Sequence, residues 1–543
     1  MGRANREGLF GGRAARFARA PRRGAARDGR NRAQAQSRPG SGEEAMKHAW
    51  SIALLLGATF ACGGAQTTKV QPTARTQPSA APGPASKDPE PWRAQRPPAG
   101  PASEVHFPVP EQVKLKNGLT VMVARKPVPV ASISLVFRHG GAACPPDKSG
   151  LAALTARLLT EGTKRHPGVK LAEEVEQLGT TLDEDAGRDT SSLSLSALTR
   201  DVDRALQLLG EVSTEPALLP VDFERVKNEW LDGLRSERQA PERLGSLATL
   251  GSLLGKPHGS PVSGSLVDVR KLTLKDVSDF HRKAYRAGDA LLIVVGDVDP
   301  SAIAKSAEKA LGKLTPGQSE LEQPFVPPAP PQTKRLLLVD RPGAVQSSLM
   351  IAQLAGKRSD PGYEQRELLT TLFGGLFTSR LNLNLREEHA YTYGARAQNL
   401  ATRSWGALLL ATSVRTDVTA DALKEAMKEL AQLKDPKLGK PIRAEEVARA
   451  RADLVQSVGA RLEYGQRLGS TLSELWLHGL PGDYFQKYPS LLAAETPESL
   501  ARAAAAIDLD RLLVVVVGDR QQIEKPLLAL GYQVQAAPPE LTE

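Results

Sequence analysis

The chain has 543 residues, and 41% of them are hydrophobic. At about 100–200 residues per domain, this length predicts two or three globular units with sizeable cores. The net charge of +10 would suit a protein that binds nucleic acid, but residues 1–45 alone carry +7 and leave only +3 for the rest of the chain. Nucleic acid is therefore excluded as an expected partner of the globular part.

Residues 1–45 form a basic leader, with eleven Arg and four acidic residues in a segment rich in Gly and Ala. No hydrophobic periodicity runs through it, so it cannot build a core and we expect it to be disordered. We interpret it as the product of an upstream start codon assigned in error, with Met46 as the true start. The alternative is a basic arm that binds a phosphate backbone.

Residues 46–64 are typical of a secretory segment. The basic stretch MKH at 46–48 precedes an apolar run at 49–61, and CGG follows at 62–64. The run is too short for a permanent membrane span but suits the hydrophobic region of a signal peptide. A small residue before Cys62, with Gly after it, resembles a bacterial lipoprotein box. We expect lipidation of Cys62 and a location in the bacterial cell envelope, periplasmic and held to a membrane by the lipid; plain signal cleavage and a buried helix are the alternatives.

Residues 65–107 are rich in Pro and Ala and poor in large aliphatic side chains, which predicts an extended tether. The only other cysteine is Cys144, so the fold is not expected to depend on disulfides. No pattern typical of a catalytic triad surrounds Cys144, and we predict an inert, packed thiol rather than a nucleophile.

The rest of the chain is predicted to be duplicated. The apolar run at 290–297 returns at 511–519, so that Gly296 and Gly518 occupy equivalent positions. The segment VASISLVF at 130–137 is echoed by VQSSLMIA at 345–352. We interpret these segments as buried strands, the first pair of which ends in Gly-Asp turns.

Amphipathic helices are predicted between the paired strands of each half. The predicted helices are 170–178 and 200–212 in the first half and 420–433 and 444–460 in the second. Strands and helices around one sheet in each half predict an α+β fold with two homologous αβ sandwich domains. The predicted domains are 108–314 and 334–535, joined by a linker at 315–333 and followed by a tail at 536–543.

Two segments resemble motifs of the pitrilysin/insulinase family of zinc metallopeptidases, which includes the mitochondrial processing peptidase. Residues 150–163, GLAALTARLLTEGT, are similar to the family's zinc-helix pattern GLAHxLEHxxFxGT. Residues 374–393 are similar to its C-terminal signature, GGxxxSRLxxxLREkxgLaYxv. The resemblance covers roughly residues 108–535 and implies a two-lobed subunit that forms half of a clamshell.

The resemblance also implies that the zinc site is degenerate. Ala153, Ala156 and Arg157 occupy the positions of the first His, the base Glu and the second His, and Gly233 occupies the position of the distal Glu ligand. Methyl groups bind no metal, and a guanidinium stays charged and repels a cation. We expect no metal and no cofactor in this chain, with zinc only in a partner subunit. Arg157 is expected to pair with Asp232 or Glu229.

In family members, the resemblance implies, the Arg and Tyr of the C-terminal signature bind the substrate carbonyl and its oxyanion. Arg386 and Tyr393 occupy these positions. Three other candidates are expected to have no part in catalysis or metal binding. His258 is predicted to be structural, His389 to face solvent without a proton role, and Asp183–Asp185 to form a solvated acidic turn. Residues 180–195 match the family's edge strand, which pairs with an extended substrate in active subunits.

The resemblance therefore predicts a non-catalytic, substrate-binding partner of an HxxEH-bearing subunit. Together the two would form a heterodimeric zinc peptidase that processes peptides or unfolded protein, with Arg386 and Tyr393 acting in trans. The first alternative is a peptide-binding or scaffold protein with no catalytic partner. The second is an active metalloendopeptidase with an unrecognised metal arrangement, although no two His of the chain are spaced i, i+4.

Overall fold

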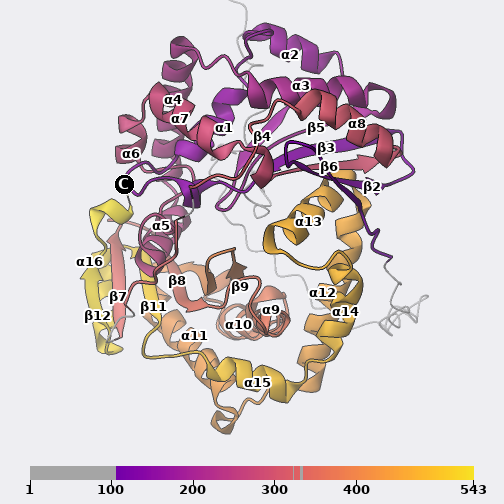
Figure 1. The fold of residues 1–543 in the computed structure, drawn as a ribbon. Helices are drawn as coiled ribbons and strands as arrows, with labels where there is room; N and C mark the ends of the chain where they lie inside the picture. The colour runs from indigo at the N-terminus through magenta and orange to yellow at the C-terminus, as the bar shows by residue number, and fades with distance from the viewer. Residues whose placement is uncertain (1–105, 322, 330–333, 543) are drawn as a thin grey trace, which may run out of the picture. The chain divides into compact units, whose positions relative to one another are not determined.

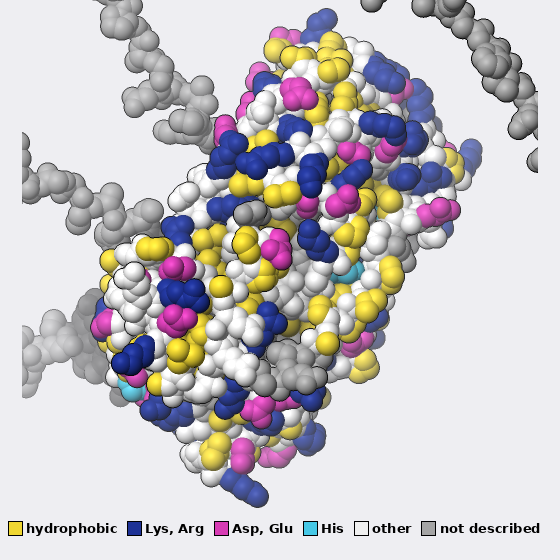
Figure 2. All heavy atoms as spheres, turned by 90° about the vertical axis from the view of Figure 1, so that its left-hand side faces the viewer, with side chains coloured by type: hydrophobic (Ala, Val, Ile, Leu, Met, Phe, Trp, Pro, Cys, Tyr) yellow, Lys and Arg dark blue, Asp and Glu magenta, His cyan; other side chains and the backbone are white. Residues whose placement is uncertain are grey.

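The computed structural model describes residues 106–321, 323–329 and 334–542. The predicted leader, the secretory segment with Cys62 and nearly all of the tether lie outside these residues. Within them, no helix combines the length and the apolar character that crossing a membrane requires. On the face drawn in Figure 2, acidic side chains are interspersed among the Lys and Arg side chains.

The first half contains a six-stranded mixed sheet (Figure 1). The apolar run at 290–296 forms its central strand, which is buried along its whole length. Edge positions go to the two short polar strands. In spatial order the strands are β1 (Glu111–Lys114), β2 (Thr120–Arg125), β6 (Ala290–Gly296), β3 (Val130–Phe137), β5 (Ser191–Leu198) and β4 (Asp183–Ala186).

The second half repeats this sheet, which confirms the predicted duplication. Its strands in spatial order are β12 (Gln533–Ala536), β7 (Arg335–Asp340), β11 (Leu513–Gly518), β8 (Gln346–Ala355), β10 (Gly406–Arg415) and β9 (Thr392–Ala401). Five consecutive strands match in direction: β2-β6-β3-β5-β4 in the first sheet and β7-β11-β8-β10-β9 in the second. In each set only the first pair is parallel and the other pairs are antiparallel. The outermost strands differ: β1 is antiparallel to β2, whereas β12 is parallel to β7.

The helices of the first half begin at strong local signals. Proline occupies the first turn of α4, α5 and α8, where its missing N–H costs nothing. Thr273 and Asp276 form a capping box at α7. The helices are α1 (Leu151–Leu159), α2 (Val169–Glu176), α3 (Val202–Thr214), α4 (Pro220–Glu237), α5 (Pro241–Leu254), α6 (Leu266–Lys271), α7 (Leu274–Ala284) and α8 (Pro300–Leu311).

The second half has eight α-helices among the described residues and two π-helical segments. The π-helical segments η5 (Thr371–Gly375) and η6 (Leu383–Glu388) flank the short α10 (Arg380–Asn382), which is the region of the C-terminal signature. The other helices are α9 (Tyr363–Thr370), α11 (Thr419–Lys434), α12 (Ala444–Glu463), α13 (Gly465–His478), α14 (Tyr484–Ala493), α15 (Pro497–Ala505) and α16 (Arg520–Ala529).

Each half lends one helix to the sheet of the other half (Figure 1). Helix α5 packs against β8 and β11, and helix α13 packs against β3 and β6. Leu468 and Leu472 of α13 share a hydrophobic core with Ile293 of β6. A Cβ on Gly465 would lie 2.5 Å from Ser132 Oγ, so the absence of a side chain permits this close approach.

The two exchanged helices are themselves a repeat, in addition to the repeated strands predicted from the sequence. The tetrapeptide RLGS occurs at 243–246 in α5 and again at 467–470 in α13. The same spacing relates the first residues of α4 and α12, Pro220 and Ala444. The repeated tetrapeptide could have indicated from the sequence alone that α4 and α5 correspond to α12 and α13.

Candidate functional site

Helix α1 carries three of the four degenerate zinc-site positions. Leu154 and Leu158, spaced i, i+4, are buried in the core of the first half, and of the nine residues of α1 only Arg157 is partly exposed. Ala153 and Ala156 are buried as well. Gly233 is half-buried on α4, which packs against α1. The four positions that the resemblance implies are thus brought to one pair of packed helices.

Arg157 holds an ion-pair network at the position of the second His. Its Nη2 lies 2.8 Å from Glu161 Oε1, and its Nε lies 3.7 Å from Glu184 Oε1 on β4. Glu161 also pairs with Arg225 of α4. The network therefore links α1, β4 and α4 through side chains, and its cation is a guanidinium, which offers no lone pair to a metal.

The predicted partners of Arg157 are wrong. Glu229 pairs with Arg225 at 3.0 Å and Asp232 pairs with Arg235. Each acid is satisfied by an Arg three or four residues away on its own helix, where side chains are neighbours. Such local pairs form at little entropic cost and leave Arg157 to Glu161, in the turn after α1, and to Glu184 of β4.

The predicted acidic turn at 183–185 is also wrong, because these residues form strand β4. Asp183, Glu184 and Asp185 pair in register with Ser194, Leu193 and Ser192 of β5. Strand β4 lies at the edge of the sheet. Burial raises the pKa of Glu184 to about 7, while the nearby Arg157 opposes that shift. Throughout the described part of the chain, no group of three or more His, Cys, Asp or Glu side chains is arranged to hold a metal ion.

The C-terminal signature presents Arg386 and Tyr393 to solvent. Arg386 lies in η6, and its guanidinium carbon stacks 4.0 Å from the ring centre of Phe377. The Arg386 side chain is 33% exposed, and its Nε lies 3.6 Å from Glu387 Oε1. Tyr393 lies in β9 and is 92% exposed. An Arg backed by an aromatic ring and a free phenol are both available to a bound molecule.

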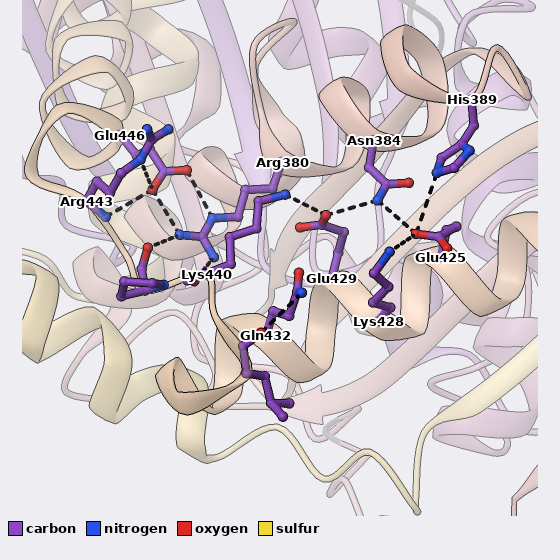
Figure 3. A network of polar contacts seen from close by, with 12 residues as sticks. Arg380, Asn384, His389, Glu425, Lys428, Glu429, Gln432, Lys440, Arg443 and Glu446 are labelled. Atoms are coloured by element: carbon purple, nitrogen blue, oxygen red, sulfur yellow. Dashed lines mark hydrogen bonds and ion pairs between the residues drawn. The ribbon is translucent and has the colours of Figure 1, made fainter.

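Two buried asparagines fix the backbone of this region, and neither was predicted from the sequence. Asn382 accepts from the backbone N–H of Ala395 at 2.8 Å and donates to its carbonyl at 2.9 Å, so it joins α10 to β9. Asn384 donates to Glu425 and Glu429 of α11 at 3.1 and 3.0 Å (Figure 3). Their signal in the sequence was two amides inside an otherwise apolar helical stretch, where buried amides need partners.

Two ion pairs, the first buried and the second partly exposed, extend the same network (Figure 3). Arg380 is almost completely buried and donates from Nε and Nη2 to the two carboxylate oxygens of Glu446, at 3.0 and 2.9 Å. Lys440 lies 2.6 Å from Glu429. Paired charges in this arrangement fix the backbone of the signature, because removing one partner would leave a buried charge uncompensated.

The remaining candidates, His258, His389 and Cys144, each have partners or burial that account for them without a role in catalysis. His258 is buried, with Nε2 2.9 Å from the carbonyl of Gln323. His389 is about one-third exposed, stacks on Tyr391 and lies 3.7 Å from Glu425. Cys144 is buried, and burial raises the pKa of its thiol to about 12, so the thiolate is absent near neutral pH.

Two sheets that share five strands of the same topology, a helix at the zinc-helix position without ligands, and a solvent-accessible Arg and Tyr define a peptidase-like fold without the metal site. Comparisons with known proteins agree. Residues 120–249 match the insulinase family, peptidase family M16, and residues 271–454 match the peptidase M16 inactive domain. The chain belongs to the pitrilysin/insulinase (M16) family as a catalytically inactive member.

Relatives in the family carry differing descriptions. The chain is 25% identical over 364 residues to the non-peptidase homolog YmxG of Helicobacter pylori, covering 66% of this chain and 82% of that protein. It is 23% identical over 354 residues to an uncharacterized zinc protease of Rickettsia bellii, covering 63% and 81%. A crystal structure described as a peptidase M16 inactive domain from Pseudomonas fluorescens matches with a TM-score of 0.69 and 25% identity, over 76% of this chain and 98% of that one.

Two subunits of mitochondrial complexes match shorter stretches. Human cytochrome b-c1 complex subunit 1 is 27% identical over 210 residues, or 38% of this chain and 44% of that protein. The mitochondrial-processing peptidase subunit beta of Caenorhabditis elegans is 24% identical over 222 residues, or 40% and 48%. The chain spans less than half of each of these two proteins.

Proposed function

We propose that this protein is the substrate-binding, non-catalytic partner of an HxxEH-bearing M16 subunit, and that Arg386 and Tyr393 complete the partner's active site. The observation that carries the proposal is the contrast between the two halves. The zinc-site positions hold two alanines, a glycine and an ion-paired Arg, whereas Tyr393 of the signature is exposed and Arg386 is one-third exposed and stacks on Phe377. Its similarity to a processing-peptidase subunit supports a role within a complex.

The two side chains suit the stabilisation of negative charge. A fixed guanidinium and a phenol aimed at a peptide carbonyl can stabilise the oxyanion of a tetrahedral intermediate by several kcal/mol. The stacking of Arg386 on Phe377 and the buried bonds of Asn382 and Asn384 reduce the motion that such a group would have to lose on binding. The zinc ion and its activated water belong to the partner subunit in this proposal.

The substrate would be a peptide or an unfolded protein bound in an extended form. Location in the bacterial cell envelope, with a lipid on Cys62 and residues 65–107 as a tether, belongs to the same proposal. It would place the complex where unfolded exported chains occur.

The test is reconstitution with an HxxEH-bearing M16 subunit from the same organism. Cleavage of an unfolded, fluorogenic peptide is expected only in the mixture. Arg386→Ala and Tyr393→Phe should each lower kcat of the mixture by about 10²-fold, because a donor to the oxyanion is lost. Size-exclusion chromatography should show that each variant still assembles.

Arg396→Ala is the matched control, since Arg396 is an exposed Arg of the same strand as Tyr393. It should leave kcat unchanged. Assembly with an unaltered kcat in Arg386→Ala would contradict the role in trans. Cleavage and stoichiometric zinc in this chain alone would contradict the proposal altogether.

A scaffold role is the second candidate, and the similarity to cytochrome b-c1 complex subunit 1 favours it. A scaffold would form a stable complex in which Arg386→Ala and Tyr393→Phe have no effect on any peptidase activity.

A further inference from the structure

A cleft of about 330 Å³ lies between α12 and α13, outside the site described above. Helix α13 is the one that covers the sheet of the first half (Figure 1). Serine and threonine hydroxyls, two arginines and one glutamate line the cleft: Ser457, Ala460, Arg461, Arg467, Ser470, Thr471 and Glu474.

The duplication provides a reference for the charges in this cleft. By the spacing of the two RLGS tetrapeptides, Arg461 and Arg467 correspond to Glu237 and Arg243 of the first half. Glu237 and Arg243 form an ion pair at 2.9 Å, and Arg243 also donates to Ser263 at 2.9 Å. At these two positions the second half therefore has two cations where the first half has an ion pair. Its carboxylates lie instead at Glu463 and Glu474, which correspond to the uncharged Gln239 and Leu250.

The carboxylate in the cleft does not neutralise both arginines. Glu474 accepts from Arg461 at 2.9 Å, but it also accepts from Nε and Nη2 of the buried Arg358, at 3.2 and 3.1 Å. Arg467 has weaker partners, 3.6 Å from Glu463 and 3.4 Å from the carbonyl of Ala460. The carboxylate of Glu474 is thus shared by the guanidinium groups of Arg358 and Arg461, and the guanidinium group of Arg467 is held only by longer contacts.

The hydroxyl groups that line the cleft already donate to the backbone, so the guanidinium groups are the donors that could bind a ligand. Ser457, Ser470 and Thr471 donate to backbone carbonyls of their own helices, at 2.7, 3.1 and 2.9 Å. The donors left for a ligand are N–H groups of Arg461 and Arg467. A planar guanidinium matches the two oxygens of a carboxylate better than any single-point donor.

We propose that this cleft binds a carboxylate, supplied either by a small free dicarboxylate or by an acidic side chain of a peptide. The site takes the place that Glu237 occupies in the first half: the ligand carboxylate pairs with Arg467 and with the free edge of Arg461. The proposal rests on the cleft and the duplication alone and is independent of the proposed peptidase complex.

Isothermal titration calorimetry on the full chain tests it with three organic probes and with inorganic phosphate as a fourth. Glutarate represents the free dicarboxylate, a blocked Gly-Glu-Gly-Glu-Gly peptide represents the acidic side chain, and its Gln counterpart is the uncharged control. Binding of glutarate or of the Glu peptide is expected, and the probe that binds identifies the source. The Gln peptide should not bind.

Two variants connect binding to the cleft. Arg467→Ala should weaken binding at least about tenfold, because a charge-assisted hydrogen bond is lost. Arg461→Glu, which restores the ion pair of the first half, should abolish it. Arg243→Ala is the matched control and should leave the affinity unchanged, and thermal unfolding verifies that each variant is folded.

Three results would overturn the proposal. They are no binding by either carboxylate probe at millimolar concentration, the same affinity in folded Arg467→Ala and Arg461→Glu as in the wild type, and tighter binding of inorganic phosphate than of either carboxylate. The last result would show that the ligand class is wrong even though the cleft is occupied.

Discussion

Position 157 shows how a metal-ligand position can be reused within an unchanged helix. A guanidinium there cannot bind a cation, but it pairs with Glu161, two residues beyond the end of α1, and lies within reach of Glu184 on the edge strand. The substitution thus exchanges coordination for ion pairing between α1 and β4. Glu184 is the member of this set whose environment is most unfavourable to charge, because burial raises its pKa to about 7.

The pKa of Glu184 predicts a pH dependence of stability. Since it is raised from 4.5 to about 7 in the folded state, the folded protein binds more protons than the unfolded chain between these values. The contribution of Glu184 to the free energy of unfolding therefore falls as the pH rises through this window. Glu184→Gln should be more stable than the wild type at pH 8, by up to about 3 kcal/mol, and equal to it near pH 4.

Urea unfolding of both proteins at pH 4, 6 and 8 measures this difference. A Gln variant that is less stable than the wild type at pH 8 would show that the contact with Arg157 outweighs the cost of burying the carboxylate.

What the sequence can tell about single residues depends on how far away their partners are. The missing ligands at 153, 157 and 233 and the missing base at 156 are readable because they are identities at known spacings. The partner of Arg157 on β4 was missed because that contact depends on sheet pairing. The two acids of α4 that were expected to pair with Arg157 are instead paired with Arg225 and Arg235.

At the scale of elements, the paired glycines of the C-terminal signature act differently. A Cβ on Gly374 would lie 2.5 Å from the backbone N of Ala397 and 2.6 Å from its Cβ, whereas a Cβ on Gly375 would meet only Thr371, at 3.3 Å. Gly374 therefore allows η5 to approach β9, the strand that carries Tyr393.

Gly374→Ala should push η5 and β9 apart and destabilise the protein by about 1–3 kcal/mol, the usual cost of overpacking. Gly375→Ala is the matched control and should cost clearly less. The midpoint of urea unfolding measures both. Equal effects of the two substitutions would contradict the close approach as the cause.

Elements with strong local patterns were predicted well. The strand at 130–137 has the predicted bounds, and the helix predicted at 444–460 is α12, which continues to Glu463. The short polar strand β4 was not predicted from its own pattern, because it reads DEDA and has no hydrophobic alternation; only the family resemblance at 180–195 indicated an edge strand there. Its pairing with β5 supplies the order that its own sequence lacks.

At the scale of the whole molecule, the exchanged helices make the two sheets depend on each other. Without α13, the face formed by β3 and β6 would lose the core that contains Leu468, Leu472 and Leu475. Without α5, the second sheet would lose Ala248, which packs with Met350 and Val515. Exposed apolar sheet faces of this kind favour aggregation.

The two halves should therefore be insoluble when produced alone and soluble when produced together. Fragments 106–321 and 334–543 can be expressed separately and jointly, and the soluble fraction and its size-exclusion profile measured. Joint expression should yield a complex of both fragments. A monodisperse, folded single half would show that the exchanged helix is dispensable.

The exchange of helices also has a consequence for synthesis. Strand β6 ends at Gly296 and α13 ends at His478, so α8 to α12 and β7 to β10 are all made between the completed first sheet and the helix that covers it. At about 5–20 residues per second, a ribosome needs roughly 10–40 s to make that stretch. A first sheet that forms before α13 is available exposes the hydrophobic face of β3 and β6 that this helix covers in the folded protein.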